Sequence, residues 1–172
     1  PTLLGQWQDE LKKFAPGLKV GTFHAMAHGA GPDYKEAALR QLGGADVILT
    51  SFYMDLGKRL NSRKMGDHGI RRLIIDESHL AAGTCATRKN MLSFDPRFVW
   101  MLTGTPLSAS VSELTAQASV LGASSWLADL LRSPAGQATA HGLRERMIRH
   151  TKSQRIDGEV ALALPRASFR VE

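Results

Sequence analysis

Two adjacent carboxylates and a histidine, Asp76, Glu77 and His79, follow an apolar run within residues 70–75. A short apolar run rich in β-branched residues is typical of a strand covered on both faces, as in a parallel sheet packed between helices. In open α/β sheets, ligands bind beyond the carboxyl ends of such strands. There, one acid can hold a hydrated magnesium ion while its neighbour orients a water for attack on a phosphoryl group. Asp76 fits the first role and Glu77 the second; the alternative is a polar strand end that opens onto a solvated loop.

Hydroxyl side chains end two other runs that we expect to be strands. Residues 46–51 finish in Thr50 and Ser51. Residues 97–102 lead into a second polar cluster, which consists of Thr103, Gly104, Thr105 and Pro106. Hydroxyls and backbone N–H groups can bind phosphate oxygens without reading base sequence. For the second cluster, the alternative is ordinary turn chemistry before a proline.

Helices and strands are expected to alternate along most of the chain. The hydrophobic pattern predicts helices at residues 2–14, 33–42 (with Asp33 as N-cap), 52–60, 84–92 and 112–121. Strands are predicted at residues 18–24, 46–51, 70–75 and 97–102. The last third is predicted to be mostly helical, at residues 125–131 and 142–147, before extended segments at 159–164 and 167–171. This alternation indicates a parallel sheet with right-handed crossover helices.

The composition is that of a globular domain. The 172 residues are 43% hydrophobic and 22% charged, and the net charge of +6 favours a polyanionic partner. The single Cys85 excludes an internal disulfide, and no stretch reaches the roughly 18 apolar residues of a membrane helix. Because the chain opens with Pro1, we expect it to be a piece of a longer protein.

A basic run lies between the second and third predicted strands. Only Asp67 opposes its six members, which are Lys58, Arg59, Arg63, Lys64, Arg71 and Arg72. Such a run is more often a solvated loop than a binding site.

The order of these motifs resembles the first motor lobe of superfamily 2 helicases, and more narrowly the SWI/SNF-type DNA-dependent ATPases. The resemblance rests on residues 1–7, 49–52, 76–79 and 102–106, with support from residues 147–152 and from Leu164, Pro165 and Val171. It covers nearly the whole chain. In that family, strand-end acids followed by a histidine form the Walker B motif, and Thr-Gly-Thr-Pro after an apolar strand is motif III.

The resemblance implies a role for each matching residue. Asp76 is expected to hold Mg²⁺ through water, Glu77 to polarise the attacking water, and His79 to couple the ATP site to nucleic-acid contacts. Motif III, with Thr103, Gly104 and Thr105, is expected to bond toward the Asp-Glu-Ser-His turn and to carry the nucleotide state across the lobe. The expected contacts with the DNA backbone are Thr2, Leu3, Thr50 and Ser51. The alternative for His79 is an ordinary loop histidine.

The sequence departs from the family pattern in three places. No Gly-x-x-x-x-Gly-Lys-Ser/Thr phosphate loop occurs in the chain, since Gly57-Lys58 lacks both the earlier glycine and the following hydroxyl. Ser108-Ala109 replaces the usual Gln-Asn after motif III, and the segment that follows is short. The second RecA-like lobe, which supplies an arginine finger, is also absent, and we expect the chain alone to be inactive. Because the phosphate loop is missing, we expect it to bind ATP with Mg²⁺ far more weakly than the full motor does.

We therefore expect a three-layer RecA-like α/β fold of the P-loop NTPase type, with a mostly parallel sheet flanked by helices and incomplete at the N-terminus. Residues 1–172 are expected to form one partial ATP-binding lobe. The resemblance implies a nuclear, ATP- and Mg²⁺-dependent enzyme that acts on double-stranded DNA or chromatin, in remodelling or repair, away from membranes. The alternatives are a catalytically dead α/β interaction module and another superfamily 2 enzyme, such as an RNA helicase or a restriction-type translocase.

Overall fold

A computed structural model describes residues 2–25, 34–62, 70–81, 85–106, 111–123, 127, 132, 147–148, 154–156 and 159–160. They belong to two compact units, Pro1–Ser125 and Trp126–Glu172. The expectation that the chain forms one lobe remains a prediction. No helix among the described residues has the length and apolar character needed to cross a bilayer.

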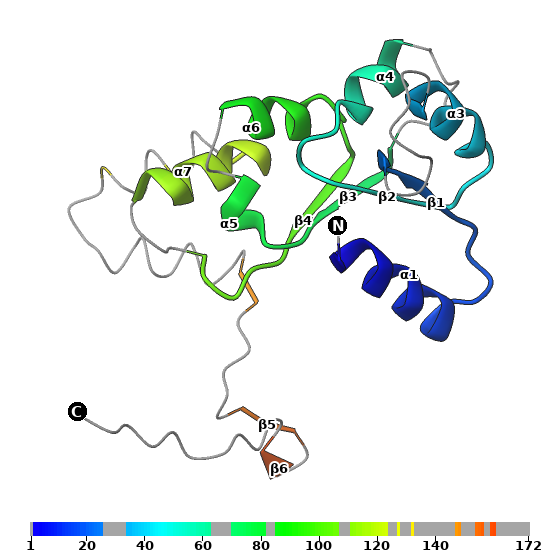
Figure 1. The fold of residues 1–172 in the computed structure, drawn as a ribbon. Coiled ribbons are helices and arrows are strands. Elements are labelled where there is room, and N and C mark those ends of the chain that lie inside the picture. Colours follow the sequence, from blue (N-terminus) through cyan, green and yellow to red (C-terminus); the bar gives the residue numbers. More distant parts are fainter. Residues whose placement is uncertain are drawn as a thin grey trace, which may run out of the picture. The chain divides into compact units, whose positions relative to one another are not determined.

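The first strand pair is parallel and lies between helices (Figure 1). Strand β1 (Val20–Phe23) pairs with β2 (Val47–Thr50), so that Val20 lies opposite Val47 and Phe23 opposite Thr50. Helix α1 (Thr2–Phe14) lies on one side of the pair, and α3 (Tyr34–Gln41) and α4 (Leu56–Ser62) lie on the other (Figure 1). This helix–sheet–helix arrangement is the one predicted from the sequence.

The second strand pair is also parallel. Strand β3 (Arg72–Ile75) pairs with β4 (Phe98–Met101), with Ile75 opposite Met101. Helices α5 (Ser78–Ala81) and α6 (Cys85–Leu92) follow β3, and α7 (Val111–Val120) follows β4; the three helices pack on one another. Because both strands run in the same direction, their carboxyl ends lie at one edge, where Asp76 and Leu102 follow directly.

One apolar core joins the two strand pairs. Helix α4 packs on α6, and buried residues of both pairs and their helices form a single cluster. Its members are Phe23, Ala38, Leu39, Leu42, Leu56, Ile75, Met91, Phe94 and Val120. Burial of apolar surface is the main term that stabilises such a unit.

The prediction that the central strand is covered on both faces is wrong. Leu73 and Ile75 face the core, whereas Ile74 is 49% exposed and its neighbour Trp100 is 54% exposed. The Arg72 guanidinium lies 4.9 Å from the Trp100 ring centroid, on this open face. Leu73, Ile74 and Ile75 are all aliphatic, so their sequence alone does not separate the buried face of the strand from the open one.

The predicted elements agree with the structure in type and differ at their ends. The helix predicted at residues 52–60 begins at Leu56, because the Met54 N–H donates to the Ser51 carbonyl at 3.1 Å and closes a turn first. The short helix α5 was not predicted. Asp33, the proposed N-cap of α3, lies outside the described residues.

The second unit is described only in part. Strand β5 (Arg155–Ile156), which was not predicted, pairs antiparallel with β6 (Glu159–Val160), the start of a predicted extended segment. Leu127 is helical and buried, as the helix predicted at residues 125–131 requires. The rest of that helix, nearly all of the one predicted at 142–147, and residues 161–171 lie outside the described part of the chain.

Candidate active site

The two acids lie on a tight turn at the carboxyl end of β3. Glu77 has a φ of 47°, in the left-handed region that costs a non-glycine residue about 1–3 kcal/mol. Its N–H donates to Asp76 Oδ1 at 3.0 Å, which fixes the Asp76 carboxylate beside the turn. Glu77 therefore projects from a constrained backbone, with its side chain 47% exposed.

Backbone bonds attach this turn to the end of β4. The Leu102 N–H donates to the Ile75 carbonyl at 2.9 Å, and the Ser78 N–H donates to the Leu102 carbonyl at 3.0 Å. The Leu80 N–H donates to the Glu77 carbonyl at 2.9 Å and begins α5. The two strand ends are thereby held together beyond the last paired residues.

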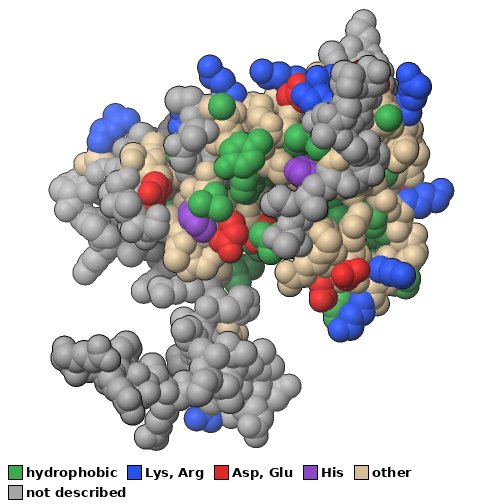
Figure 2. Space-filling view, viewed as in Figure 1, with side chains coloured by type: hydrophobic (Ala, Val, Ile, Leu, Met, Phe, Trp, Pro, Cys, Tyr) green, Lys and Arg blue, Asp and Glu red, His purple; other side chains and the backbone are tan. Residues whose placement is uncertain are grey.

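His79 bridges the acids and the Thr103–Thr105 segment. Its Nδ1 lies 2.8 Å from Thr103 Oγ1 and 3.4 Å from Glu77 Oε2. The Thr105 N–H donates to Thr103 Oγ1 at 3.1 Å, so that this hydroxyl also orders the backbone around Gly104. Figure 2 shows a histidine beside acidic side chains on one face of the molecule. The structure thus brings together Asp76, Glu77, His79 and Thr103, the first threonine of the Thr103–Thr105 segment.

Helix α1 reaches the same site through one side chain. Trp7 Nε1 donates to Asp76 Oδ2 at 3.3 Å, and both groups are partly buried. Gln8 donates to Thr22 Oγ1 at 2.7 Å and fastens α1 to β1. The sequence places Trp7 in an amphipathic helix and in the stretch that resembles the family, but it predicts no role for Trp7 in the site, because its long-range partner is not visible in a local pattern.

A buried polar chain lies behind the site and was not predicted. Ser78 Oγ donates to Gln117 Oε1 at 2.9 Å, and Gln117 Nε2 donates to the Pro106 carbonyl at 2.7 Å. Ser78 is fully buried and Gln117 is 6% exposed. The available signal was a glutamine flanked by Ala116 and Ala118 in a predicted helix, since a buried polar residue needs partners.

The residues predicted to contact DNA lie at the start of α1 and at the end of β2. Thr2 begins α1, and the adjacent Leu3 is exposed. The Thr50 hydroxyl donates to the Phe23 carbonyl at 3.0 Å, so its hydrogen is committed within the sheet. Ser51 is half-buried just after β2. A direct contact links α1 to the acids, through Trp7 and Asp76, and the DNA role of these four residues stays a prediction.

The donor set at Asp76 can be compared with what Mg²⁺ requires. Within the described ranges, no group of three or more His, Cys, Asp or Glu side chains could hold a metal ion. Mg²⁺, however, commonly keeps several waters and binds one or two carboxylates together with substrate phosphates. The partly buried Asp76 carboxylate, oriented by Trp7 and the Glu77 N–H, fits that requirement.

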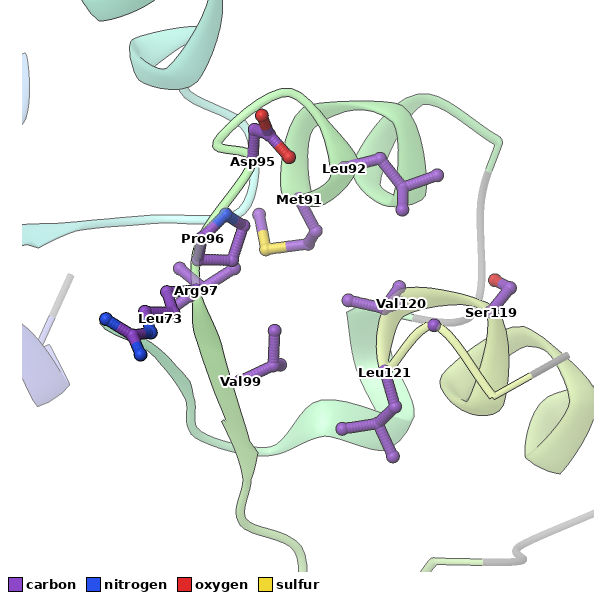
Figure 3. Close-up of a pocket in the computed structure, with 11 residues that line it drawn as sticks. Leu73, Met91, Leu92, Asp95, Pro96, Arg97, Val99, Ser119, Val120 and Leu121 are labelled. Atoms are coloured by element: carbon purple, nitrogen blue, oxygen red, sulfur yellow. The ribbon is translucent and has the colours of Figure 1, made fainter. Parts of the chain in front are cut away.

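A pocket of about 270 Å³ lies at the opposite end of the second strand pair (Figure 3). It is lined by Leu73, Met91, Leu92, Asp95, Pro96, Arg97, Val99, Ser119, Val120, Leu121 and Gly122. Asp95 to Arg97 precede β4, whereas the candidate site follows it. The pocket is therefore separate from the acids and takes no part in their chemistry.

Comparison with known proteins identifies the family. The family model described as the SNF2-related domain matches residues 1–156. The DNA repair protein RAD5A of Arabidopsis thaliana is 28% identical over 194 aligned residues, which cover 99% of this chain and 18% of the relative. The ATP-dependent helicase FUN30 of Saccharomyces cerevisiae is 26% identical over 112 residues, or 64% of this chain and 10% of the relative.

A solved structure gives the fold. It is described as the Sulfolobus solfataricus SWI2/SNF2 ATPase core in complex with dsDNA, and it matches with a TM-score of 0.52 at 20% identity. The match covers 83% of this chain and 30% of that one.

The chain belongs to the SNF2-related domain family, which confirms the resemblance to SWI/SNF-type ATPases. Its fold is the RecA-like α/β fold of an SNF2 ATPase core, as predicted. The chain spans about a tenth to a fifth of the length of these curated relatives.

Proposed function

We propose that this chain carries the hydrolytic acids of an ATP-dependent enzyme that translocates on, or remodels, double-stranded DNA or chromatin. The observation that carries the proposal is the Asp76–Glu77 turn at the end of β3, joined by His79 to Thr103, in a chain of the SNF2-related family. The relatives named as a DNA repair protein and a helicase support the same class.

In this proposal the two acids divide the work. Asp76, oriented by Trp7 and by the Glu77 N–H, holds Mg²⁺ through water. Bound Mg²⁺ and ATP supply the charge neutralisation and the phosphoryl group. Glu77, more exposed and on a constrained turn, accepts a hydrogen bond from the attacking water and aims it.

His79 and the Thr103–Thr105 segment couple the site to the rest of the lobe. The His79 ring contacts Glu77 on one side and Thr103 on the other, so a change at the acids moves the loop after β4. The DNA backbone would be contacted by α1 near Thr2 and Leu3 and by the strand end at Thr50 and Ser51. Helix N-termini and backbone N–H groups bind phosphates without reading sequence, which a translocating enzyme requires. Such an enzyme acts in the nucleus.

A second candidate function is an interaction module that has kept the fold without hydrolysis. The 172 residues contain no Gly-x-x-x-x-Gly-Lys-Ser/Thr pattern, whose backbone would cradle the β- and γ-phosphates, and a full-length protein that also lacks this loop would favour the interaction module. A phosphate loop upstream in the same full-length protein would favour the enzyme instead.

The test compares ATP hydrolysis by the full-length protein and its Glu77→Gln variant, with and without duplex DNA. We expect DNA-stimulated hydrolysis that the substitution slows by about a hundredfold or more, with nucleotide binding retained, because glutamine cannot accept a proton. Near-normal turnover in the variant would remove Glu77 from this role. No hydrolysis in the unmodified protein would favour the interaction module.

A further inference from the structure

Two segments of the candidate site are joined by a side chain that belongs to neither. Gln117 lies in the middle of α7, and its amide spans from the Ser78 hydroxyl at 2.9 Å to the Pro106 carbonyl at 2.7 Å. Ser78 lies between Glu77 and His79, and Pro106 follows Thr105. One planar amide group therefore connects the acid-bearing turn to the loop after β4.

The geometry assigns the direction of both bonds. An amide oxygen only accepts and an amide NH₂ only donates, so the Ser78 O–H donates to Oε1 and Nε2 donates to the Pro106 carbonyl. Ser78 is fully buried and Gln117 is 6% exposed, which leaves little room for water to replace either partner. In a buried site such bonds are strong and directional.

The same two segments are also joined at the surface. His79 Nδ1 contacts Thr103 Oγ1 at 2.8 Å, and the His79 side chain is 20% exposed. The surface contact depends on the histidine tautomer and on the Glu77 carboxylate 3.4 Å away. The buried contact depends on neither, so it can persist when the surface contact breaks.

We propose that Gln117 is a positioning residue that holds the Thr103–Pro106 loop against the Asp76–His79 turn, so that movement of one segment is passed to the other during hydrolysis. This inference rests on the proposed function. A role in packing alone would not require a glutamine, because an apolar side chain of similar volume can replace a buried polar group when its partners are also removed.

The test uses the full-length protein and three variants. Gln117→Met keeps the volume and removes both bonds, and Ser78→Ala removes one bond. Ser119→Ala is the matched control, because the Ser119 hydroxyl donates to the Ala116 carbonyl of its own helix at 2.6 Å. For each variant we would measure the melting temperature, the KM for ATP, and kcat with and without duplex DNA.

We expect Gln117→Met to lower DNA-stimulated kcat per folded molecule by about tenfold, with KM for ATP changed less than about twofold. Ser78→Ala should lower it by about fivefold, and the double variant should be no worse than Gln117→Met, because both act through one chain of bonds. Ser119→Ala should leave kcat unchanged.

The inference is overturned if Gln117→Met melts earlier but keeps its DNA-stimulated kcat, or if the two losses simply add. Should Gln117→Met not fold, Ser78→Ala decides alone, and an unchanged kcat in that variant overturns the inference. Absence of DNA-stimulated hydrolysis in the unmodified protein would overturn the proposed function, and this inference with it.

Discussion

Backbone strain and proposed chemistry coincide at Glu77. Its φ of 47° costs energy that a glycine would avoid, and neighbouring backbone bonds hold the turn in place. A glycine there would lack the carboxylate that the proposed reaction needs. The backbone at Glu77 therefore lowers the stability of the fold while it fixes the direction in which the Glu77 side chain projects.

Trp7 permits a test of how Asp76 is oriented. In Trp7→Phe a smaller aromatic ring remains, but the N–H that donates to Asp76 Oδ2 at 3.3 Å is lost. Hydrogen bonds that orient a metal-binding side chain typically contribute about 10–100-fold to metal affinity. The Mg²⁺ concentration for half-maximal hydrolysis should therefore be about tenfold higher for full-length Trp7→Phe than for the unmodified protein.

Trp100→Phe is the matched control for Trp7→Phe. Trp100 lies on the open face of β4, 54% exposed, and its loss should leave the Mg²⁺ requirement unchanged. Equal Mg²⁺ dependence in the unmodified protein and Trp7→Phe would show that the indole does not orient Asp76.

At the residue scale, local pattern was informative where chemistry is local. Asp76, Glu77 and His79 stand out because charge follows an apolar run, and the structure places Thr103 beside His79. Trp7 and Gln117 were missed as site residues because their partners lie 69 and 39 positions away. Only the folded topology brings such pairs together.

At the scale of elements, ion pairs between side chains hold the start of α4 in place. The Arg59 side chain donates to Asp55 Oδ1 at 3.0 Å, and Lys35 of α3 lies 3.4 Å from the same oxygen. The hydrogen bond from Arg59, followed by the charges of Arg59 and Lys35, lowers the pKa of Asp55, while burial opposes the shift. Asp55 therefore favours the folded state when ionised.

The Asp55→Asn variant should make this effect visible as a function of pH. Because the folded-state pKa is lowered, the stabilisation is present above the unfolded pKa near 4 and is lost as pH falls through the folded value. Asparagine is favoured as strongly as aspartate at the position before a helix, here before Leu56, so the substitution does not change helix propensity there. The Asp55 side chain is 37% exposed, which limits the difference in unfolding free energy to below about 1 kcal/mol.

Urea unfolding at a series of pH values would measure that difference. We expect it to be constant from pH 7 to about pH 5 and to shrink below about pH 4. Asp9→Asn, at an exposed site on α1, is the control. A difference that grows as pH falls would contradict the assignment.

Gly57 explains why α4 can lie against the end of α6. A Cβ at this position would lie 2.9 Å from the Ser93 carbonyl carbon and 3.0 Å from the Phe94 nitrogen, and closer still to the Ser93 hydroxyl. Gly57→Ala should therefore destabilise the fold by about 1–3 kcal/mol. Gly5→Ala in α1, where the added Cβ would meet nothing within 4 Å beyond the neighbouring helix backbone, should instead stabilise the fold by up to about 1 kcal/mol. Thermal unfolding of both variants measures the contrast, and equal effects would contradict the close packing.

Element type could be predicted from the sequence better than element coverage. Hydrophobic period and Gly or Pro punctuation identified the strands β1 to β4 and the helices α1, α3, α6 and α7. They could not show that β3 and β4 expose one face, because Ile74, Phe98 and Trp100 are as apolar as core residues. The pairing of β5 with β6 depends on segments too short to carry a pattern.

At the scale of the whole molecule, the proposed function implies that charge governs how the full-length protein binds DNA. The net charge is +6, and Lys58 is exposed on α4. Its neighbour Arg59 is held by Asp55 and lies 3.9 Å from Glu36, so it is less available to a phosphate. Basic residues close in sequence are therefore not equivalent as DNA contacts.

The corresponding prediction is a salt dependence that separates these side chains. If the full-length protein binds the phosphate backbone of DNA, its affinity should be nearly independent of the DNA sequence. The affinity should fall with increasing salt, because binding releases counterions from the phosphates. Lys58→Ala should lower the slope of log affinity against log salt by about one, and Arg59→Ala should change it less. Ser51→Ala should weaken DNA-stimulated hydrolysis and leave the slope unchanged, because a hydroxyl carries no charge. Titration of unrelated duplexes across a salt series measures the slope for each of the three variants, and an ATPase assay with duplex DNA measures hydrolysis by Ser51→Ala. Affinity that does not change with salt, or a strong preference for one duplex, would contradict binding to the DNA backbone and favour the interaction module.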